Sequence, residues 1–311
     1  MDNIICIAGP TASGKTALAV QLAKALDAEV VSCDSMQVYK RMDIGTAKPT
    51  PAEMEGIPHH MLSVAEPTED FSVSRYCEMA TPIIDDILSR GKTAIIAGGT
   101  GLYMDALIKG NTFAPYPSTG RREELEALAA AEGIEAVIRQ LQIVDPDSAA
   151  RLHPSDQKRI IRAMEVYLET GKSITQHNLE TQALPPRYKP VLFALEDSER
   201  AALYKRIDLR VEQMLEQGLI QEIRQLLDSG VPEKATAMQA IGYKEYVDAL
   251  NGRCSIDEAT SLVQQASRHY AKRQLTWFRR NSAIHWLTRT PEDTTEKIVI
   301  RARQILADYD N

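Results

Sequence analysis

The apolar and polar positions along the first third of the chain alternate between two patterns. Short apolar runs lie at 4–8, 28–33 and 92–97, and stretches with apolar residues at helical spacing lie at 17–26, 71–90 and 102–108. Short buried runs that alternate with amphipathic helices are typical of a parallel sheet covered by helices. The pattern therefore predicts an α/β fold with a parallel sheet and flanking helices.

The strand signal disappears in the middle of the chain. Prolines in 111–118 and again in 185–188 indicate two extended linkers. Between them every segment has helical spacing, and the segments are 121–132, 134–141, 147–152 and 156–170. We expect an all-helical insertion domain at 118–187, within an α/β core built from 1–117 and 188–311.

After the second linker both signals return. The stretch 189–195 and the short run 283–287 predict two more strands. Helical spacing recurs at 198–217, 219–228, 244–251, 255–278 and 291–308. The last part of the chain is therefore expected to complete the core and to add several helices.

A glycine-rich segment joins the first strand to the first helix. Residues 9–16, GPTASGKT, match the phosphate-loop pattern G-x-x-x-x-G-K-[ST] at every fixed position. A strand, a glycine turn and a helix aim backbone N–H groups and a helix N-terminus at one point. Lys15 would pair with outer phosphates, and the Thr16 hydroxyl is placed to bind Mg²⁺. The segment predicts a di- or triphosphate site, and the alternative is a loop that only connects two elements.

Composition narrows the class of protein. The chain has 311 residues, and 44% of them are hydrophobic. Its net charge of −7 is not expected of a general nucleic-acid binder, although a local basic face is compatible with that charge. Four scattered cysteines, with no C-x-x-C pair, argue against a zinc site or disulfides and fit a reducing cytosol. No apolar run approaches a membrane span, and no signal peptide precedes the first strand. We expect a soluble, cytoplasmic protein.

Polar residues follow the predicted strands where ligands of parallel sheets bind. Asp34 follows the second strand, and Gly98-Gly99-Thr100 follows the third, where many nucleotide hydrolases have an acid instead. A carboxylate beside a phosphate loop suits a metal ligand or a general base. The alternative is that Asp34 caps the next turn. The polar loop at 41–49 beside it is compatible with a simple turn.

Two basic stretches contrast with the acidic average. The first, 151–162, predicts a helix that presents Lys158, Arg159 and Arg162. The second, 268–280, contains five Arg or Lys residues, no acid, and interleaved aromatic residues. Such a combination suits a phosphate backbone with stacked bases. The alternative is a solvated helix face whose aromatic residues, Tyr270, Trp277 and Phe278, turn into the core.

Taken together, these segments resemble the tRNA dimethylallyltransferase family, the bacterial tRNA isopentenyltransferases. The resemblance covers essentially the whole chain and rests on the segments 9–16, 34–39, 43–49, 98–103, 153–156, 162–167, 242–243 and 272–278. It implies transfer of a prenyl group from dimethylallyl diphosphate to N6 of adenine 37, next to the anticodon of tRNAs that read codons starting with U.

The resemblance also implies roles for individual residues. Asp34 would be the general base, and Thr100 and Arg122 would act with it at the reacting centre; spacing from Thr100 favours Arg122 over Arg121. The diphosphate, with Mg²⁺ on Thr16, would be bound by Gly9, Thr11, Ala12, Ser13, Gly14, Lys15 and Thr16. Arg210, four residues after Arg206 on one helix face, is a further candidate for the diphosphate, with a plain surface arginine as the alternative.

The resemblance implies contacts to the tRNA anticodon stem-loop for four groups of residues. These groups are Asp34, Ser35, Met36 and Gln37; Lys158, Arg159, Ile160, Ile161 and Arg162; Gln239, Gly242, Tyr243 and Lys244; and His269, Lys272, Arg273, Gln274 and Thr276. The protein is expected to act as a monomer.

Three other functions use the same phosphate loop. A small-molecule kinase would need an ATP adenine site and a lid, which the helical insertion could imitate. An enzyme that prenylates free AMP or ADP would not need the late basic helix. A nucleotide switch would need switch loops and a Walker-B acid, and the sequence offers no good candidate for that acid.

Overall fold

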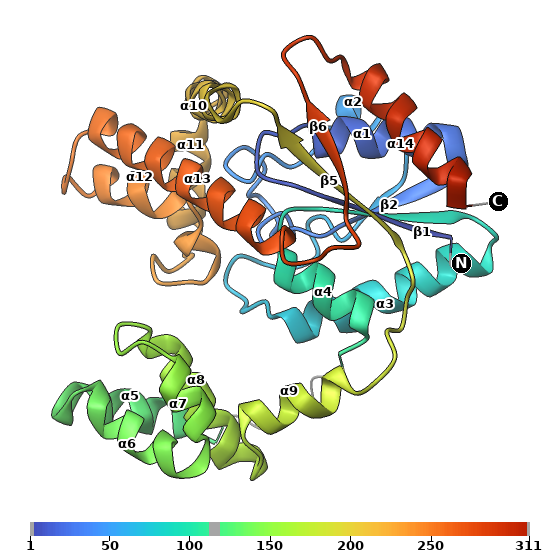
Figure 1. Ribbon diagram of the computed structural model, residues 1–311. Coiled ribbons are helices and arrows are strands. Elements are labelled where there is room, and N and C mark those ends of the chain that lie inside the picture. Colours follow the sequence, from blue (N-terminus) through green and yellow to red (C-terminus); the bar gives the residue numbers. More distant parts are fainter. Residues whose placement is uncertain (1–2, 112–118, 310–311) are drawn as a thin grey trace. The chain divides into compact units, whose positions relative to one another are not determined.

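The computed structural model describes residues 3–111 and 119–309, and the chain forms two compact units (Figure 1). One unit is Met1–Gly110 with Arg187–Asn311, and the other is Asn111–Pro186. The first predicted linker, at 111–118, lies outside the described residues except for Asn111. The predicted domain limit after 117 lies outside them too.

The first unit, the core unit, is built on a six-stranded sheet, which is parallel as predicted and contains one strand more than the five predicted. The strands, in spatial order, are β3 (His59–His60), β2 (Ala28–Ser32), β4 (Thr93–Ala97), β1 (Ile4–Ala8), β5 (Val191–Asp197) and β6 (His285–Arg289). Ile5 of β1 lies in register with Ile95 of β4 and with Val191 of β5. All five residues of β1 are buried, because this strand lies inside the sheet and is covered on both faces.

Helices cover both faces of the sheet (Figure 1). On one face lie α1 (Lys15–Leu26) and α14 (Thr295–Tyr309), and on the other lie α3 (Val73–Ser89) and α4 (Gly101–Lys109). Leu18 and Leu22 of α1 and Ile298 of α14 pack against Ile7 and Ile95 of the sheet. Each such buried side chain contributes about 1.5–3 kcal/mol, so this cluster holds the loop between β1 and α1 in place.

A group of helices lies at the carboxyl end of the sheet. They are α10 (Arg200–Glu216), α11 (Leu219–Asp228), the short 3₁₀ helix η1 (Ala237–Gln239), α12 (Tyr243–Leu250) and α13 (Ile256–Phe278). Helix α13 packs against α10 and α12. Ser255 begins α13 with a capping box, in which Glu258 accepts from the Ser255 N–H and donates its own N–H to the Ser255 hydroxyl.

The second unit, the helical unit, contains helices and no strand among its described residues. The helices are α5 (Arg121–Glu132), α6 (Ile134–Val144), α7 (Pro146–Arg151), α8 (Gln157–Thr170) and α9 (Ile174–Gln182). They enclose a core of their own, with Leu125, Val137, Leu141 and Met164 among its members. The Asp145 carboxylate caps α7 through the Ser148 N–H and accepts the Thr175 hydroxyl at 2.7 Å. This carboxylate therefore joins α9 to the rest of the unit.

Four short elements were not predicted. They are α2 (Pro51–Met54), β3, α9 and η1. The two residues of β3 are too few to show a period, and α2 is one turn started by the Thr50–Glu53 capping box. Helix α9 begins at a Ser173 cap but has no buried face, so apolar spacing gives no signal for it. Among the described residues, no helix is long and apolar enough to cross a lipid bilayer.

Candidate active site

The phosphate loop lies between β1 and α1, as the pattern requires. Gly14 caps α1 with a φ of 91°, a left-handed conformation that glycine adopts without strain. The Lys15 ammonium donates to the Pro10 carbonyl oxygen at 2.7 Å, which folds the lysine over the loop. Ser13 is 3% exposed, and no described residue bonds its hydroxyl. An unpaired buried hydroxyl in such a loop is suited to a ligand oxygen.

The loop borders a cavity of about 620 Å³, within the size range of small-molecule sites. Its wall includes residues from the phosphate loop, the segment after β2, helix α2, the segment from η1 to α12, and helices α10 and α13: Thr11 to Thr16, Asp34 to Gln37, Gly45 to Ala47, Glu53, Arg210, Gln239 to Gly242, Lys244, Tyr270, Arg273 and Gln274. All of these residues belong to the core unit. The cavity therefore brings together most of the predicted diphosphate residues and the segment that begins at Asp34.

Asp34 both caps a turn and faces the cavity. Its Oδ1 accepts from the N–H of Met36 at 2.9 Å and of Gln37 at 3.4 Å. Among the described residues, no donor is bonded to Oδ2. The two interpretations of Asp34 are thus compatible, because one oxygen fixes the turn and the other is left for a ligand or a proton.

Thr100 lies behind the cavity wall rather than in it. Its Oγ1 accepts from the Ser35 N–H at 3.0 Å, and it also bonds the Tyr270 side chain. Six core-unit site residues from the sequence prediction do not border the cavity: Gly9, Thr100, Tyr243, His269, Lys272 and Thr276. Thr100 is therefore placed to support Ser35 and Tyr270, which both border the cavity, and its role at the reacting centre stays a prediction.

Two half-buried cations face the same cavity. Burial lowers the pKa of Lys15 to about 8, and Arg210 lowers it further while Asp34 opposes the shift. Burial also lowers the pKa of Arg210. Among the described residues, none accepts a hydrogen bond from the Arg210 guanidinium. Two poorly solvated cations above a helix N-terminus favour an anionic ligand, and Arg210 is not a plain surface arginine.

Helix α13 contributes one face to the cavity and another to solvent. The residues His269, Lys272, Arg273 and Thr276 are exposed. Phe278 is buried, and the Trp277 indole donates to Asp105 at 2.9 Å. The alternative of aromatic residues packed in the core is confirmed for Phe278, and contact of the exposed residues with RNA stays a prediction.

Tyr270 is a cavity residue that the sequence prediction missed. It borders the cavity. Burial and the nearby Asp34 carboxylate raise the pKa of Tyr270 to about 12, so its hydroxyl stays protonated at neutral pH. Its position in an aromatic-basic run could have singled it out, but the spacing alone did not separate it from core aromatics.

Four residues predicted to contact tRNA have buried side chains. Ile160 and Ile161 are 0% and 6% exposed and belong to the core of the helical unit. Tyr243 is 0% exposed, and its hydroxyl donates to Glu222 at 2.6 Å. Gln274 is 5% exposed and bridges the Thr11 N–H, at 3.0 Å, to the Gly99 carbonyl oxygen, at 2.9 Å. These side chains pack or join loops within the protein, and contact of the four residues with tRNA stays a prediction.

The other predicted tRNA residues lie where a large ligand can reach them. Gln239 and Lys244 are exposed at the cavity wall, and Gly242 caps α12 beside them. In the helical unit, Lys158, Arg159 and Arg162 are exposed on α8. Their contact with RNA stays a prediction.

Arg122, predicted at the reacting centre, belongs to the helical unit. It forms a two-pronged pair with Glu165 on α8, at 3.1 and 2.8 Å. Arg162 donates to the same carboxylate at 2.9 Å. Within the unit Arg122 therefore links α5 to α8, and its catalytic role stays a prediction.

The cavity offers a few oxygen ligands for Mg²⁺, and the oxygen atoms of a bound phosphate would have to supply others. Thr16 and Asp34 both border it and offer oxygen atoms. In the described part of the chain, no three His, Cys, Asp or Glu side chains form a group that could hold a metal. Mg²⁺ in phosphate sites takes one or two protein oxygens and completes its shell with water and phosphate oxygens. The donor set therefore suits a magnesium ion that binds together with a diphosphate.

Comparison of the sequence with a family model and with known proteins gives the same family in both cases. The sequence model of one family, described as IPP transferase, matches residues 37–281. The tRNA dimethylallyltransferase of Acetivibrio thermocellus is 44% identical over 310 residues, which cover 99% of each chain.

Solved structures agree. The tRNA isopentenylpyrophosphate transferase of Bacillus halodurans is 42% identical, has a TM-score of 0.74, and is matched over 99% of this chain and 96% of its own. A eukaryotic dimethylallyltransferase, solved while acting on tRNA, is 29% identical with a TM-score of 0.82, over 98% of this chain and 79% of its own. The phosphate loop, the cavity and these matches along nearly the whole chain show that the protein belongs to the IPP transferase family, the tRNA dimethylallyltransferases.

Proposed function

We propose that this protein transfers the dimethylallyl group of dimethylallyl diphosphate to N6 of adenine 37, beside the anticodon of tRNAs that read codons starting with U, and releases pyrophosphate. The observation that supports this most is the cavity itself. Its wall contains the phosphate loop, two cations and the Asp34 carboxylate. A leaving group and a nucleophile can therefore approach each other in one site.

The cations act on the leaving group. Breaking the allylic C–O bond places negative charge on the pyrophosphate. The loop N–H groups, Lys15 and Arg210 stabilise that charge where it develops. Mg²⁺, bound by Thr16 and the phosphate oxygens, would neutralise further charge. Ser13 would donate its unpaired hydroxyl to a phosphate oxygen.

Asp34 acts on the nucleophile. The lone pair of an exocyclic amine is delocalised into the adenine ring, so the amine attacks poorly by itself. Asp34 Oδ2 would accept a hydrogen bond from N6 and take the proton as the new C–N bond forms. The adenine must leave the anticodon-loop stack to reach this carboxylate, so we expect a flipped base.

Exposed basic residues would hold the RNA. On α13 these are His269, Lys272 and Arg273, and on α8 they are Lys158, Arg159 and Arg162. Contacts of this kind bind the phosphate backbone and position the substrate without reading its sequence. We further infer that the protein works as a monomer in the cytoplasm. Its four cysteines, all in the described residues and all free, fit a reducing compartment.

A substrate panel tests the proposal. The protein is offered radiolabelled dimethylallyl diphosphate with unmodified tRNA, with AMP, or with no acceptor, and ATP consumption is followed in parallel. Label on tRNA alone is the expected result. Label on AMP would support the free-nucleotide prenyltransferase, and ATP consumption with a small acceptor would support a kinase.

A further inference from the structure

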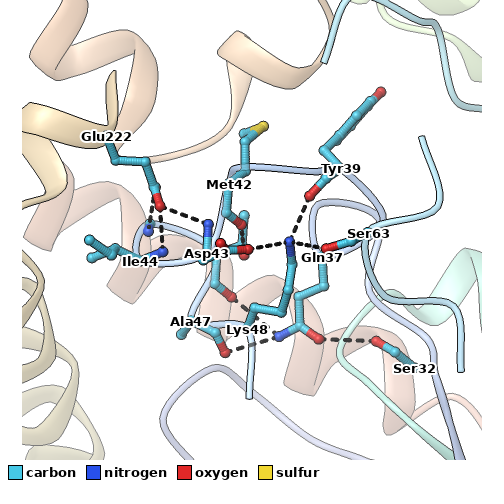
Figure 2. A network of polar contacts seen from close by, with 12 residues as sticks. Ser32, Gln37, Tyr39, Met42, Asp43, Ile44, Ala47, Lys48, Ser63 and Glu222 are labelled. Carbon is cyan, nitrogen blue, oxygen red and sulfur yellow. Dashed lines mark hydrogen bonds and ion pairs between the residues drawn. The ribbon is translucent and has the colours of Figure 1, made fainter. Parts of the chain in front are cut away.

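One carboxylate outside the cavity binds three consecutive backbone amides of a loop that reaches the cavity wall at Gly45. Glu222, in the first turn of α11, is 9% exposed. Its Oε2 accepts from the N–H groups of Asp43 and Ile44, at 2.8 Å each, and its Oε1 accepts from the Gly45 N–H at 3.2 Å (Figure 2). The Tyr243 hydroxyl adds a fourth bond.

No cation shares in this arrangement. Within the described residues, no lysine, arginine or histidine forms an ion pair with Glu222. Its charge is therefore balanced by the partial charges of the loop amides and one hydroxyl. A buried carboxylate stabilised only by such donors holds them firmly, because releasing any of them leaves buried charge less solvated.

The opposite side of the same loop faces the cavity. Gly45, Thr46 and Ala47 border it. The Gln37 amide donates to the carbonyl oxygens of Thr46, at 3.3 Å, and Ala47, at 3.1 Å. The Ser32 hydroxyl donates to the other end of that amide at 3.0 Å (Figure 2). The loop therefore determines which way the side-chain amide of Gln37 points, and Gln37 belongs to the turn that Asp34 caps.

Two further contacts leave the loop little freedom. The Lys48 ammonium donates to the Tyr39 carbonyl oxygen at 2.7 Å and to the Ser63 hydroxyl at 2.8 Å. A Cβ on Gly45 would lie 2.5 Å from the Tyr243 ring, so the backbone there is in close contact with α12. Glu222 completes the support on the side of α11.

We propose that Glu222 is a positioning residue, which holds the loop 43–47 and, through Gln37, the cavity wall beside Asp34. The inference rests on the proposed function, because that wall is the side at which the RNA base would arrive. No hydrogen bond of Glu222 reaches the phosphate loop in the described structure. Loss of the carboxylate should therefore impair use of tRNA and spare binding of the diphosphate.

Hydrogen exchange of the loop amides tests whether Glu222 holds the loop 43–47, without any assay of activity. In Glu222→Gln, an NH₂ group replaces one of the two carboxylate oxygens. This group cannot accept a hydrogen bond from the backbone N–H groups that it faces. The N–H groups of Asp43, Ile44 and Gly45 should then exchange about 10- to 100-fold faster, while those of β1 and β4 stay unchanged. Unchanged exchange at the loop would overturn the proposal.

Kinetics and binding test the consequence. The kcat/KM for tRNA of Glu222→Gln should fall about tenfold or more, while its Kd for inorganic pyrophosphate with Mg²⁺ stays within about twofold of wild type. Equal losses in both quantities would indicate general damage and contradict a positioning role. If wild-type protein prenylates no tRNA, the proposed function fails, and the exchange rates still decide whether Glu222 holds the loop.

Two more variants control the experiment. Glu216→Gln makes the same charge change at an exposed site near the end of α10 and should match wild type in every measurement. Tyr243→Phe removes one donor to Glu222 but keeps the ring, so it should fold and raise loop exchange by a smaller factor. If Glu222→Gln does not fold, Tyr243→Phe still decides the question. Unaltered hydrogen exchange of the loop amides in that variant would contradict the proposal that Glu222 holds the loop.

Discussion

At the scale of single residues, Asp34 and Lys15 border the same cavity and divide the proposed chemistry between them. Asp34 has one oxygen engaged in a turn, and the other is left for a proton. Lys15 is a cation whose charge is only partly stabilised in the free protein, as its lowered pKa shows. A bound diphosphate would supply the missing stabilisation.

Replacement of Asp34 tests the base. Asp34→Asn keeps an oxygen for the Met36 and Gln37 N–H groups, so the turn should persist while the basic oxygen is lost. We expect kcat to fall about 10²- to 10⁴-fold with the Kd for tRNA unchanged within about twofold, measured by single-turnover rates and filter binding. A loss of tRNA affinity as large as the loss of rate would contradict the base role.

The pH dependence of pyrophosphate binding tests Lys15. Its pKa is about 8 in the free protein, and a bound anion raises it, so binding takes up a proton above pH 8. Affinity attributable to Lys15 should be constant below pH 8 and fall about tenfold by one pH unit above it.

Lys15→Arg is the matched control for this titration, because arginine stays charged over the range while pyrophosphate itself titrates identically in both experiments. The ratio of the two affinities, from calorimetry between pH 7 and pH 9.5, isolates the lysine. A ratio that does not change with pH would show that Lys15 does not titrate in the site.

At the scale of elements, α13 joins the phosphate loop to the loop after β4. Gln274 makes this connection with both ends of its amide, and both bonds are buried or partly buried. The sequence pattern placed the residue on the correct helix, and the family resemblance assigned it to a contact with tRNA. An amide between two loops that are distant in sequence has no local pattern, and only the folded chain shows its partners.

Substitution of Gln274 should loosen both loops. Gln274→Met has similar length but leaves the Thr11 N–H and the Gly99 carbonyl oxygen unpaired, which costs on the order of 2 kcal/mol of unfolding free energy. Urea denaturation measures it, and Gln265→Met, an exposed position on the same helix, is the control. Equal stability of the two variants would mean that the Gln274 bridge adds nothing.

Sequence predicted the local features of this site and missed the non-local ones. The phosphate loop, Asp34 and the strands that deliver them have patterns within a few residues, and the structure places them as expected. Glu222 has no such pattern, because its three amide partners lie about 180 positions earlier. Tyr270 was inseparable from core aromatics for the same reason, since burial depends on the packing of whole helices.

At the scale of the whole molecule, the proposed tRNA contacts belong to both units. Those in the core unit surround the cavity and α13, and those in the helical unit lie on α8. A net charge of −7 is compatible with the proposed RNA contacts, because exposed basic residues lie together on α8 and on α13.

Charge reversal tests the helical unit. Lys158→Glu should weaken tRNA binding, because it removes a cation that would neutralise one RNA phosphate. The slope of log K against log salt concentration should become less steep by about one phosphate contact. Arg139→Glu makes the same reversal at an exposed position on α6 and should have little effect. Identical salt titrations of Lys158→Glu and wild type would remove α8 from the interface.

The most direct test of the whole account locates the transferred group. Wild-type protein is incubated with dimethylallyl diphosphate, Mg²⁺ and a synthetic anticodon stem-loop with adenine at position 37, and the digested RNA is examined by mass spectrometry. The account predicts one five-carbon unit on N6 of that adenine for each pyrophosphate released. A protein that binds both substrates yet leaves this adenine unmodified, or modifies another base, would contradict it.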